Sequence, residues 1–291
     1  MELLDPEPEL RDEARPNRGV YLLPSLFTVG TLVCGYLSIL ATLKGAQALS
    51  SHSGNSYAFF DDAAIKIAWA FVFDALDGRI ARLTNAASNF GKEFDSLADI
   101  IAFGIAPALL AYAWGIEAIH AGYGAPLVLI YTQRAGWLVG FAFLICGAVR
   151  LARFNIDRGA TADRRYFVGL PIPAAAGMVA AVVHWGKYPV EHWIYGFVWL
   201  LIVAAAAYLM ISKVRYYSFK VMDLRKKRSH LVIILMGLIV WAIWAYSEPV
   251  LLTLATVYFL SGPVMRLIWK FRPRPPASKT ESVHSREVHV T

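Results

Sequence analysis

Four aspartates lie inside two stretches of otherwise apolar sequence, and their presence there indicates metal-dependent chemistry. They are Asp74, Asp77, Asp95 and Asp99. The first pair ends the apolar stretch 63–83 and the second pair begins the stretch 91–115. An ionisable side chain at membrane depth costs roughly 2.5–3.5 kcal/mol on insertion scales, so four of them need compensation. The neighbouring sequence offers no equal set of cations, and bound metal ions are the natural alternative.

The spacing of these aspartates predicts that they face one another. Separations of three and four residues place each pair on one face of its helix. If the two helices are antiparallel and joined by the short loop between them, Asp77 and Asp95 lie roughly 7 Å from the cytoplasmic interface, and Asp74 and Asp99 roughly 12 Å. Carboxylate oxygens are the ligands that hard Mg²⁺ or Mn²⁺ prefers. Four carboxylates match two divalent ions, which can clamp the attacking and leaving oxygens of a phosphoryl displacement.

Small and basic residues flank the aspartates on the cytoplasmic side. Gly78 and Gly91 have no side chains to obstruct a substrate, and Arg79 and Arg82 can bind phosphate oxygens. The pattern favours an enzyme whose phosphorylated substrate arrives from the cytoplasm and the lipid together. A cation-coupled transporter is the alternative from another functional class, but the broken helices and repeated halves typical of transporters are not evident in this sequence.

The composition predicts the elements that must position these residues. Hydrophobic residues make up 57% of the 291 residues and charged residues 17%, which is typical of an integral membrane protein. The expected fold is all-α, a polytopic membrane bundle of about eight transmembrane helices. The expected spans are 24–43, 63–83, 91–115, 127–149, 170–186, 193–212, 231–247 and 249–269, the fifth of them short.

The distribution of positive charge predicts the orientation. The net charge is +7, and most of the 28 Lys and Arg residues fall in alternate connecting segments. By the positive-inside rule, both termini and the aspartates face the cytoplasm of the inner cell membrane. This pattern argues against a nucleic-acid partner. We expect a polar cytoplasmic segment at 1–19, one membrane domain at 20–271 and a disordered cytoplasmic tail at 272–291.

The aspartate pattern resembles the signature of the CDP-alcohol phosphatidyltransferase family. The matching run is Asp74-x-x-Asp77-Gly78-x-x-Ala81-Arg82, followed after a loop by Gly91-x-x-x-Asp95-x-x-x-Asp99. The resemblance implies a six-helix catalytic core, usually dimeric, that holds two divalent metal ions. It implies that the four aspartates are metal ligands, with Asp99 also the candidate base. It further implies that Gly78, Ala81, Arg82 and Gly91, with Thr28 in the first span, line the nucleotide and diphosphate side.

Three further stretches resemble the branch of this family that uses L-serine. They begin at Ser96, Cys146 and Phe167. This likeness implies transfer of the phosphatidyl group from CDP-diacylglycerol to L-serine, with Arg150, Arg153 and Asn155 as the candidate acceptor site. An arginine there can hold the serine carboxylate through two hydrogen bonds. Glycerol 3-phosphate or inositol phosphate stay open as acceptors, because Arg158, Arg164 and Arg165 offer extra positive charge.

Overall fold

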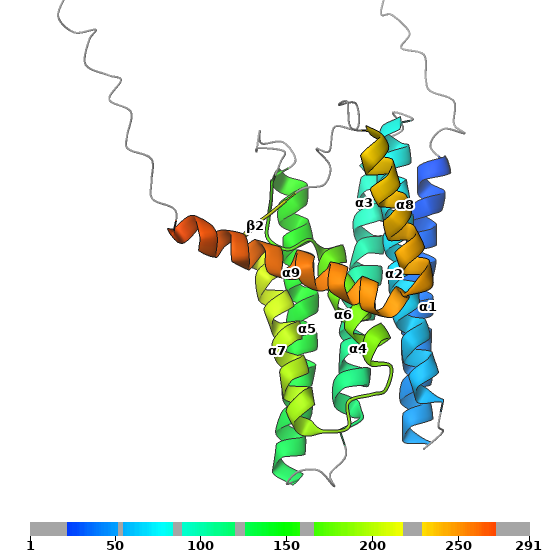
Figure 1. Cartoon of the computed structure of the whole chain (residues 1–291). Helices are drawn as coiled ribbons and strands as arrows, with labels where there is room; N and C mark the ends of the chain where they lie inside the picture. The colour runs from blue at the N-terminus through cyan, green and yellow to red at the C-terminus, as the bar shows by residue number, and fades with distance from the viewer. Residues whose placement is uncertain are drawn as a thin grey trace, which may run out of the picture.

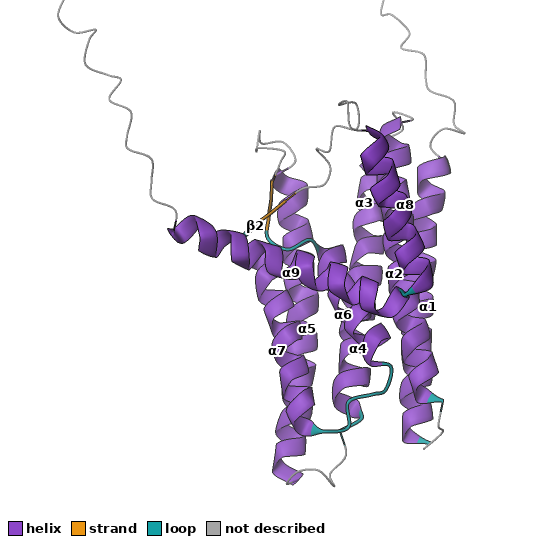
Figure 2. Cartoon of the chain, in the orientation of Figure 1, coloured by secondary structure: helices purple, strands orange, loops and turns teal. Residues whose placement is uncertain are grey.

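The computed structural model is a bundle of long helices with one short two-stranded sheet (Figures 1 and 2). It describes residues 22–51, 55–83, 89–119, 126–157, 166–217 and 229–271. In chain order the elements are α1 (Leu22–Ser50), α2 (Ser56–Leu83), α3 (Asn89–Asp99), the π-helical segment Ile100–Ile105, α4 (Ala106–Tyr112), the π-helical segment Ala113–Glu117, α5 (Pro126–Asp157), β1 (Tyr166–Val168), α6 (Ile172–Gly186), α7 (Trp193–Ile211), β2 (Arg215–Tyr217), α8 (Ser229–Ala245) and α9 (Ser247–Phe271). The helices coincide with the apolar stretches of the sequence. In a bilayer no water is available to bond the backbone, and a helix satisfies its backbone groups within its own segment.

Several of these helices have the length and composition of membrane spans, which confirms the expected all-α membrane bundle. Within the described ranges, five segments are long and apolar enough to cross a bilayer. They are Leu26–Ser50, Phe90–Glu117, Leu127–Ile156, Trp193–Ile211 and Ser247–Ile268. Helix α2 covers the expected span 63–83, but its aspartates and basic residues lower its hydropathy. The chain is therefore a multi-pass membrane protein.

Two helices depart from a simple set of parallel spans. Helix α6 has 15 residues, about 22 Å of helix, which is less than the roughly 30 Å of a hydrocarbon core. Helix α9 runs across the other long helices instead of alongside them (Figure 1). It packs on α6 and touches β2. The expected count of eight membrane spans therefore stays a prediction.

Small residues let the helices around the aspartates approach closely. A Cβ atom at Gly35 of α1 would lie 2.7 Å from the Cα of Ala102, just beyond Asp99. A Cβ at Gly45 would lie 2.8 Å from the ring of Phe60 in α2. Close backbone approach of this kind is how membrane helices gain van der Waals contact when lipid offers no hydrophobic driving force. Helix α1 thus fixes the depth of both aspartate-bearing helices.

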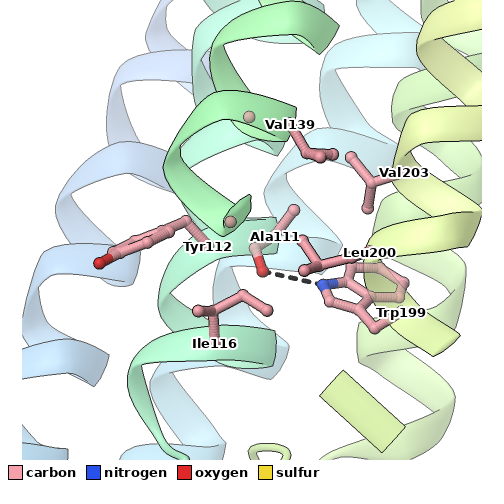
Figure 3. A pocket seen from close by; sticks show the side chains of 9 residues that line it. Ala111, Tyr112, Ile116, Val139, Trp199, Leu200 and Val203 are labelled. Carbon is pink, nitrogen blue, oxygen red and sulfur yellow. Dashed lines mark hydrogen bonds between the residues drawn. The ribbon is translucent and has the colours of Figure 1, made fainter. Parts of the chain in front are cut away.

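A tryptophan joins α7 to α4 and to the second π-helical segment. The indole of Trp199 donates a hydrogen bond of 2.8 Å to the carbonyl of Ala111 (Figure 3). A Cβ at Gly115 would lie 2.0 Å from the Trp199 ring, so only glycine fits there. The apolar pocket beside this contact has a volume of about 10 Å³ and holds no more than a water molecule. It is a packing feature and not a substrate site.

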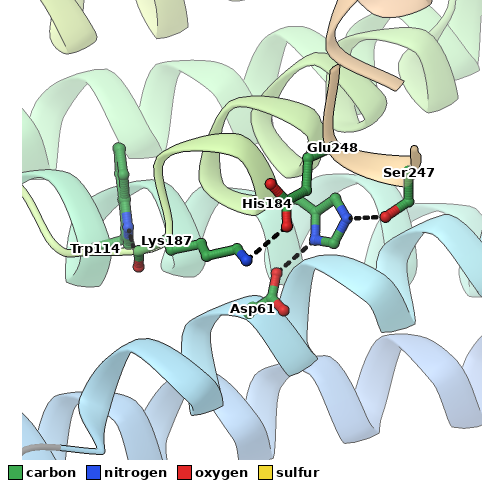
Figure 4. Close-up of polar contacts among 6 residues, drawn as sticks. All are labelled: Asp61, Trp114, His184, Lys187, Ser247 and Glu248. Atoms are coloured by element: carbon green, nitrogen blue, oxygen red, sulfur yellow. Dashed lines mark hydrogen bonds and ion pairs between the residues drawn. The ribbon is translucent and has the colours of Figure 1, made fainter. Parts of the chain in front are cut away.

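A polar network ties the end of α6 to α2 and to the start of α9 (Figure 4). The two ring nitrogens of His184 contact Asp61 and, at 3.0 Å, the hydroxyl of Ser247. Lys187 pairs with Glu248, and this hydrogen bond raises the pKa of the lysine above its ordinary value. This network fixes the position at which α9 begins. It thereby helps to determine which residues of α9 contact the bundle.

The sheet sets the entry into α6. Strand β1 pairs antiparallel with β2, with Phe167 opposite Tyr216. Gly169 follows β1 with φ +80°, and its N–H donates to the carbonyl of Val214 at 2.8 Å. A Cβ at Gly169 would lie 2.4 Å from the carbonyl oxygen of Met210. Both the positive φ and the close backbone contact require glycine at this position.

We expect Gly169→Ala to destabilise the protein. The added Cβ meets a backbone oxygen that cannot rotate away, and φ becomes unfavourable, so the loss should exceed about 1 kcal/mol. Thermal unfolding in detergent measures it. Gly177→Ala is the matched control, because a Cβ at Gly177 meets nothing within 4 Å and alanine favours the helix interior. Equal melting temperatures for the two variants would contradict the requirement for glycine at position 169.

Candidate metal centre

The end of α2 and the whole of α3 bring three aspartates together. One carboxylate oxygen from each of Asp74, Asp95 and Asp99 lies within 4.8 Å of the others. All three side chains are half-buried. The arrangement follows from the helical spacing, because Asp95 and Asp99 lie one turn apart on the face of α3 that meets Asp74. These are the residues that could hold a divalent cation.

Asp77 is not a member of this group of three. It is buried, and the Thr28 hydroxyl of α1 donates a hydrogen bond to its Oδ2. Its Oδ1 is also buried, with no hydrogen-bond partner in the described part of the chain. A buried carboxylate oxygen left in this way is costly, and a metal ion is one group that can satisfy it. Thr28, expected on the nucleotide side, therefore contacts an aspartate directly.

The charge of the cluster favours a cation. At separations below 4.8 Å, two ionised carboxylates repel by roughly 3–4 kcal/mol if the effective dielectric constant is about 20. The three carboxylates form three such pairs, so they cannot all stay ionised without a compensating positive charge. Oxygen-only ligands at partly buried positions suit Mg²⁺ or Mn²⁺ better than softer metals. The residues present thus fit a divalent metal ion.

The approach to the cluster is open on the side of Gly78. A Cβ at this exposed residue would meet nothing within 4 Å, so there is space beside Asp74 and Asp77. Gly91 lies half-buried in the first turns of α3. Ala81 and Arg82 continue α2, but their side chains lie outside the described part of the structure. Their expected role at the diphosphate stays a prediction.

The end of α5 brings two of the three expected acceptor residues to the aspartates. Arg150 interacts electrostatically with Asp99, and its Nε is buried without a hydrogen-bond partner among the described residues. Asn155 donates a 3.0 Å hydrogen bond to Ser96, the residue next to Asp95. Arg153 is exposed. The structure therefore separates two arginines that the sequence had grouped.

Some features of the site carried little or no signal in the sequence. The helix widens into a π-helical segment directly after Asp99, a feature frequent at functional sites. Ser96 connects α3 to α5 by accepting from Asn155 and donating to the carbonyl of Lys92. Tyr258 of α9 interacts electrostatically with Arg150. Sequence spacing gives no guide to such an interaction, because more than a hundred residues separate the two.

Comparison with known proteins agrees with this geometry. The model of the CDP-alcohol phosphatidyltransferase family matches residues 21–208. A protein of Helicobacter pylori named CDP-diacylglycerol–serine O-phosphatidyltransferase is 38% identical over 77% of this chain and 84% of its own length. The Bacillus subtilis protein of the same name is 32% identical over 68% of this chain and 91% of its length. An archaetidylserine synthase of Methanothermobacter thermautotrophicus is 33% identical over 67% and 69%.

We expect divalent ions to bind and stabilise the protein through the aspartate cluster. Mn²⁺ added to the purified protein should raise its melting temperature, because binding to the folded state alone shifts the unfolding equilibrium. Asp95→Asn should weaken this shift by removing a charge from the cluster. Asp62→Asn, which changes an acid elsewhere in α2 that is paired with Lys66, should leave it intact. A Mn²⁺ response that is the same in both variants would exclude this metal centre.

Proposed function

The chain belongs to the CDP-alcohol phosphatidyltransferase family, and we propose that it transfers the phosphatidyl group of CDP-diacylglycerol to the hydroxyl of L-serine, releasing CMP. Relatives named for serine transfer, at 32–39% identity, support the choice of alcohol. The observation that carries the proposal is the cluster of Asp74, Asp95 and Asp99, with Arg150 of α5 interacting electrostatically with Asp99. Arg150 has a guanidinium that can bind a carboxylate, and Asp99 has a carboxylate that can accept a proton.

The aspartates supply the chemistry of the transfer. Asp99 takes the proton of the serine hydroxyl, whose oxygen then attacks the phosphorus that bears the diacylglycerol. The bond between this phosphorus and the CMP oxygen breaks in line, and CMP leaves. Asp74, Asp77, Asp95 and Asp99 would hold two divalent ions, Mg²⁺ or Mn²⁺, which supply positive charge to the diphosphate and the departing phosphate. Gly78 leaves the space through which the diphosphate approaches.

Serine is recognised by its carboxylate. The guanidinium of Arg150 can form two parallel hydrogen bonds with it, and the short serine backbone then leaves the hydroxyl near Asp99. Asn155, held by Ser96, lies at the same end of α5. Arg153 is exposed on the same stretch of α5 and is the second candidate for the carboxylate. A phosphorylated acceptor would need further positive charge, and the candidates Arg158, Arg164 and Arg165 lie outside the described residues.

The enzyme works at the cytoplasmic face of the inner cell membrane, with both termini in the cytoplasm. The positive-inside distribution of Lys and Arg supports this orientation. It places the aspartates where water-soluble serine and lipid-soluble CDP-diacylglycerol meet. Exposed apolar side chains along α5, among them Trp137, Phe141 and Ile145, suit contact with lipid or with a second copy of the chain. The family resemblance favours a homodimer.

The decisive test of the reaction is an acceptor panel. We expect the purified protein with CDP-diacylglycerol to release CMP with L-serine and to lose this activity in chelator. Glycerol 3-phosphate, inositol phosphate and no acceptor are the comparisons. Asp99→Asn should reduce turnover at least a hundredfold if it serves as general base. Faster CMP release with a phosphorylated alcohol than with serine would overturn the proposed acceptor.

The orientation has its own test, by cysteine labelling in spheroplasts. In a background where Cys34 and Cys146 are replaced by Ala, Leu83→Cys lies at the end of α2 beside the site and Ser51→Cys lies at the opposite end. Both positions are exposed. A membrane-impermeant maleimide added outside should label Ser51→Cys only, and Leu83→Cys should react after lysis. Labelling of Leu83→Cys before lysis would show that the orientation is the reverse of the one proposed.

A further inference from the structure

An open groove lies between the end of α4 and the first half of α5. It is lined by Tyr112 of α4 and by Gln133, Arg134, Trp137 and Leu138 of α5, and its volume is about 460 Å³. Sites for small ligands have volumes of about 300–1,000 Å³, so the groove has room for a small polar group and part of an apolar chain. Polar and ionisable residues are rare at membrane depth, and a group of them facing one hollow indicates a binding site.

The groove lies far from the aspartates. Arg134 is roughly 10 Å along α5 from the start of its apolar span, and Tyr112 is roughly 7 Å from the end of the preceding span. On the same helix, Arg134 is roughly 24 Å from Arg150, the residue that interacts with Asp99. Helix α5 crosses the membrane, so the groove belongs to the leaflet opposite the aspartate site.

Close packing of α5 shapes this hollow. Gly136 is buried, and a Cβ there would lie 2.9 Å from the side chain of Ile116 in the second π-helical segment. With Gly136 turned inward, the next two residues, Trp137 and Leu138, are exposed on the outside of the bundle. The Tyr112 ring points away from the buried Trp199 contact (Figure 3). Two elements therefore bring polar side chains to one surface that faces lipid.

The charge of the groove favours an anion. Arg134 is exposed, and among the described residues its side chain forms no ion pair or hydrogen bond. A guanidinium has five N–H donors and no acceptor, and at membrane depth such a cation needs a partner. Glu117 ends the preceding span and is also exposed, but the structure shows no ion pair between Glu117 and Arg134. The side chains of Tyr112 and Gln133 add further donors.

We propose that this groove binds an anionic phospholipid of the leaflet opposite the aspartates. The guanidinium of Arg134 forms two parallel hydrogen bonds with the lipid phosphate, a geometry that arginine and phosphate share. Tyr112 and Gln133 donate to the remaining oxygens of the headgroup, and Leu138 and Trp137 pack along an acyl chain. Tyrosine and tryptophan are the residues that membrane proteins favour at this depth. The inference goes beyond the proposed function and holds for any acceptor alcohol.

Lipid titration followed by native mass spectrometry tests this site, with phosphatidylglycerol as the anionic probe and phosphatidylcholine as the zwitterionic one. We expect the wild-type protein to prefer phosphatidylglycerol. Arg134→Gln should weaken its affinity for this lipid about tenfold, the scale of a lost charged hydrogen bond, and remove the preference. Tyr112→Phe keeps the ring and should weaken the affinity about threefold.

Lys44→Gln is the matched control. Lys44 is an exposed cation of α1 at a similar distance from the end of its span in the same leaflet, and it does not line the groove. Its replacement should leave the affinity for both lipids unchanged. The melting temperature without added lipid should be the same in all variants, because each replaced side chain makes no polar contact with another described residue.

Equal affinities of wild type and Arg134→Gln for phosphatidylglycerol overturn the proposal. An equal loss in Lys44→Gln overturns it too, because binding would then reflect general attraction of lipid by surface charge. Competition by inorganic phosphate would assign the groove to a soluble anion instead. A smaller dimer fraction in Arg134→Gln with unchanged lipid affinity would assign the groove to a second copy of the chain.

Discussion

Mutual repulsion among three neighbouring carboxylates is the constraint that the candidate site has to meet. Asp74, Asp95 and Asp99 are held within 4.8 Å of one another in half-buried positions, and helices in a membrane cannot solvate such charge with bulk water. Helices α1 and α5 hold the aspartate-bearing helices in place, through the hydrogen bonds from Thr28 to Asp77 and from Asn155 to Ser96. A divalent ion bound there would offset the repulsion, so we expect ion binding to stabilise the folded site.

The surrounding helices meet that constraint with close contacts between small residues. Gly35 of α1 lies against Ala102, and this contact holds the π-helical segment that follows Asp99. The Thr28 hydroxyl on the same helix reaches Asp77. Helix α1 thus supports the site both by packing and by a hydrogen bond. A wider helical turn after Asp99 also changes the face on which later residues of the segment lie.

The far side of the bundle contributes through α6 and α9. Helix α6 is short and mostly buried, and the sheet, through Gly169, sets where it starts. The network around His184 then fixes the start of α9, which packs on α6 and touches β2.

The sequence by itself determined the class of fold and the chemistry of the site. Apolar content and helical spacing are local properties, so they predict membrane helices and the convergence of the four aspartates, of which Asp74, Asp95 and Asp99 form one close group in the structure. Tertiary packing decided how each helix is rotated. Arg150 and Arg153 are three residues apart, which turns them about 60° from each other, and the packing of α5 leaves one against Asp99 and the other exposed. The hydrogen bonds from Thr28 to Asp77 and from Asn155 to Ser96 likewise join residues far apart in the chain, where no periodic pattern carries information.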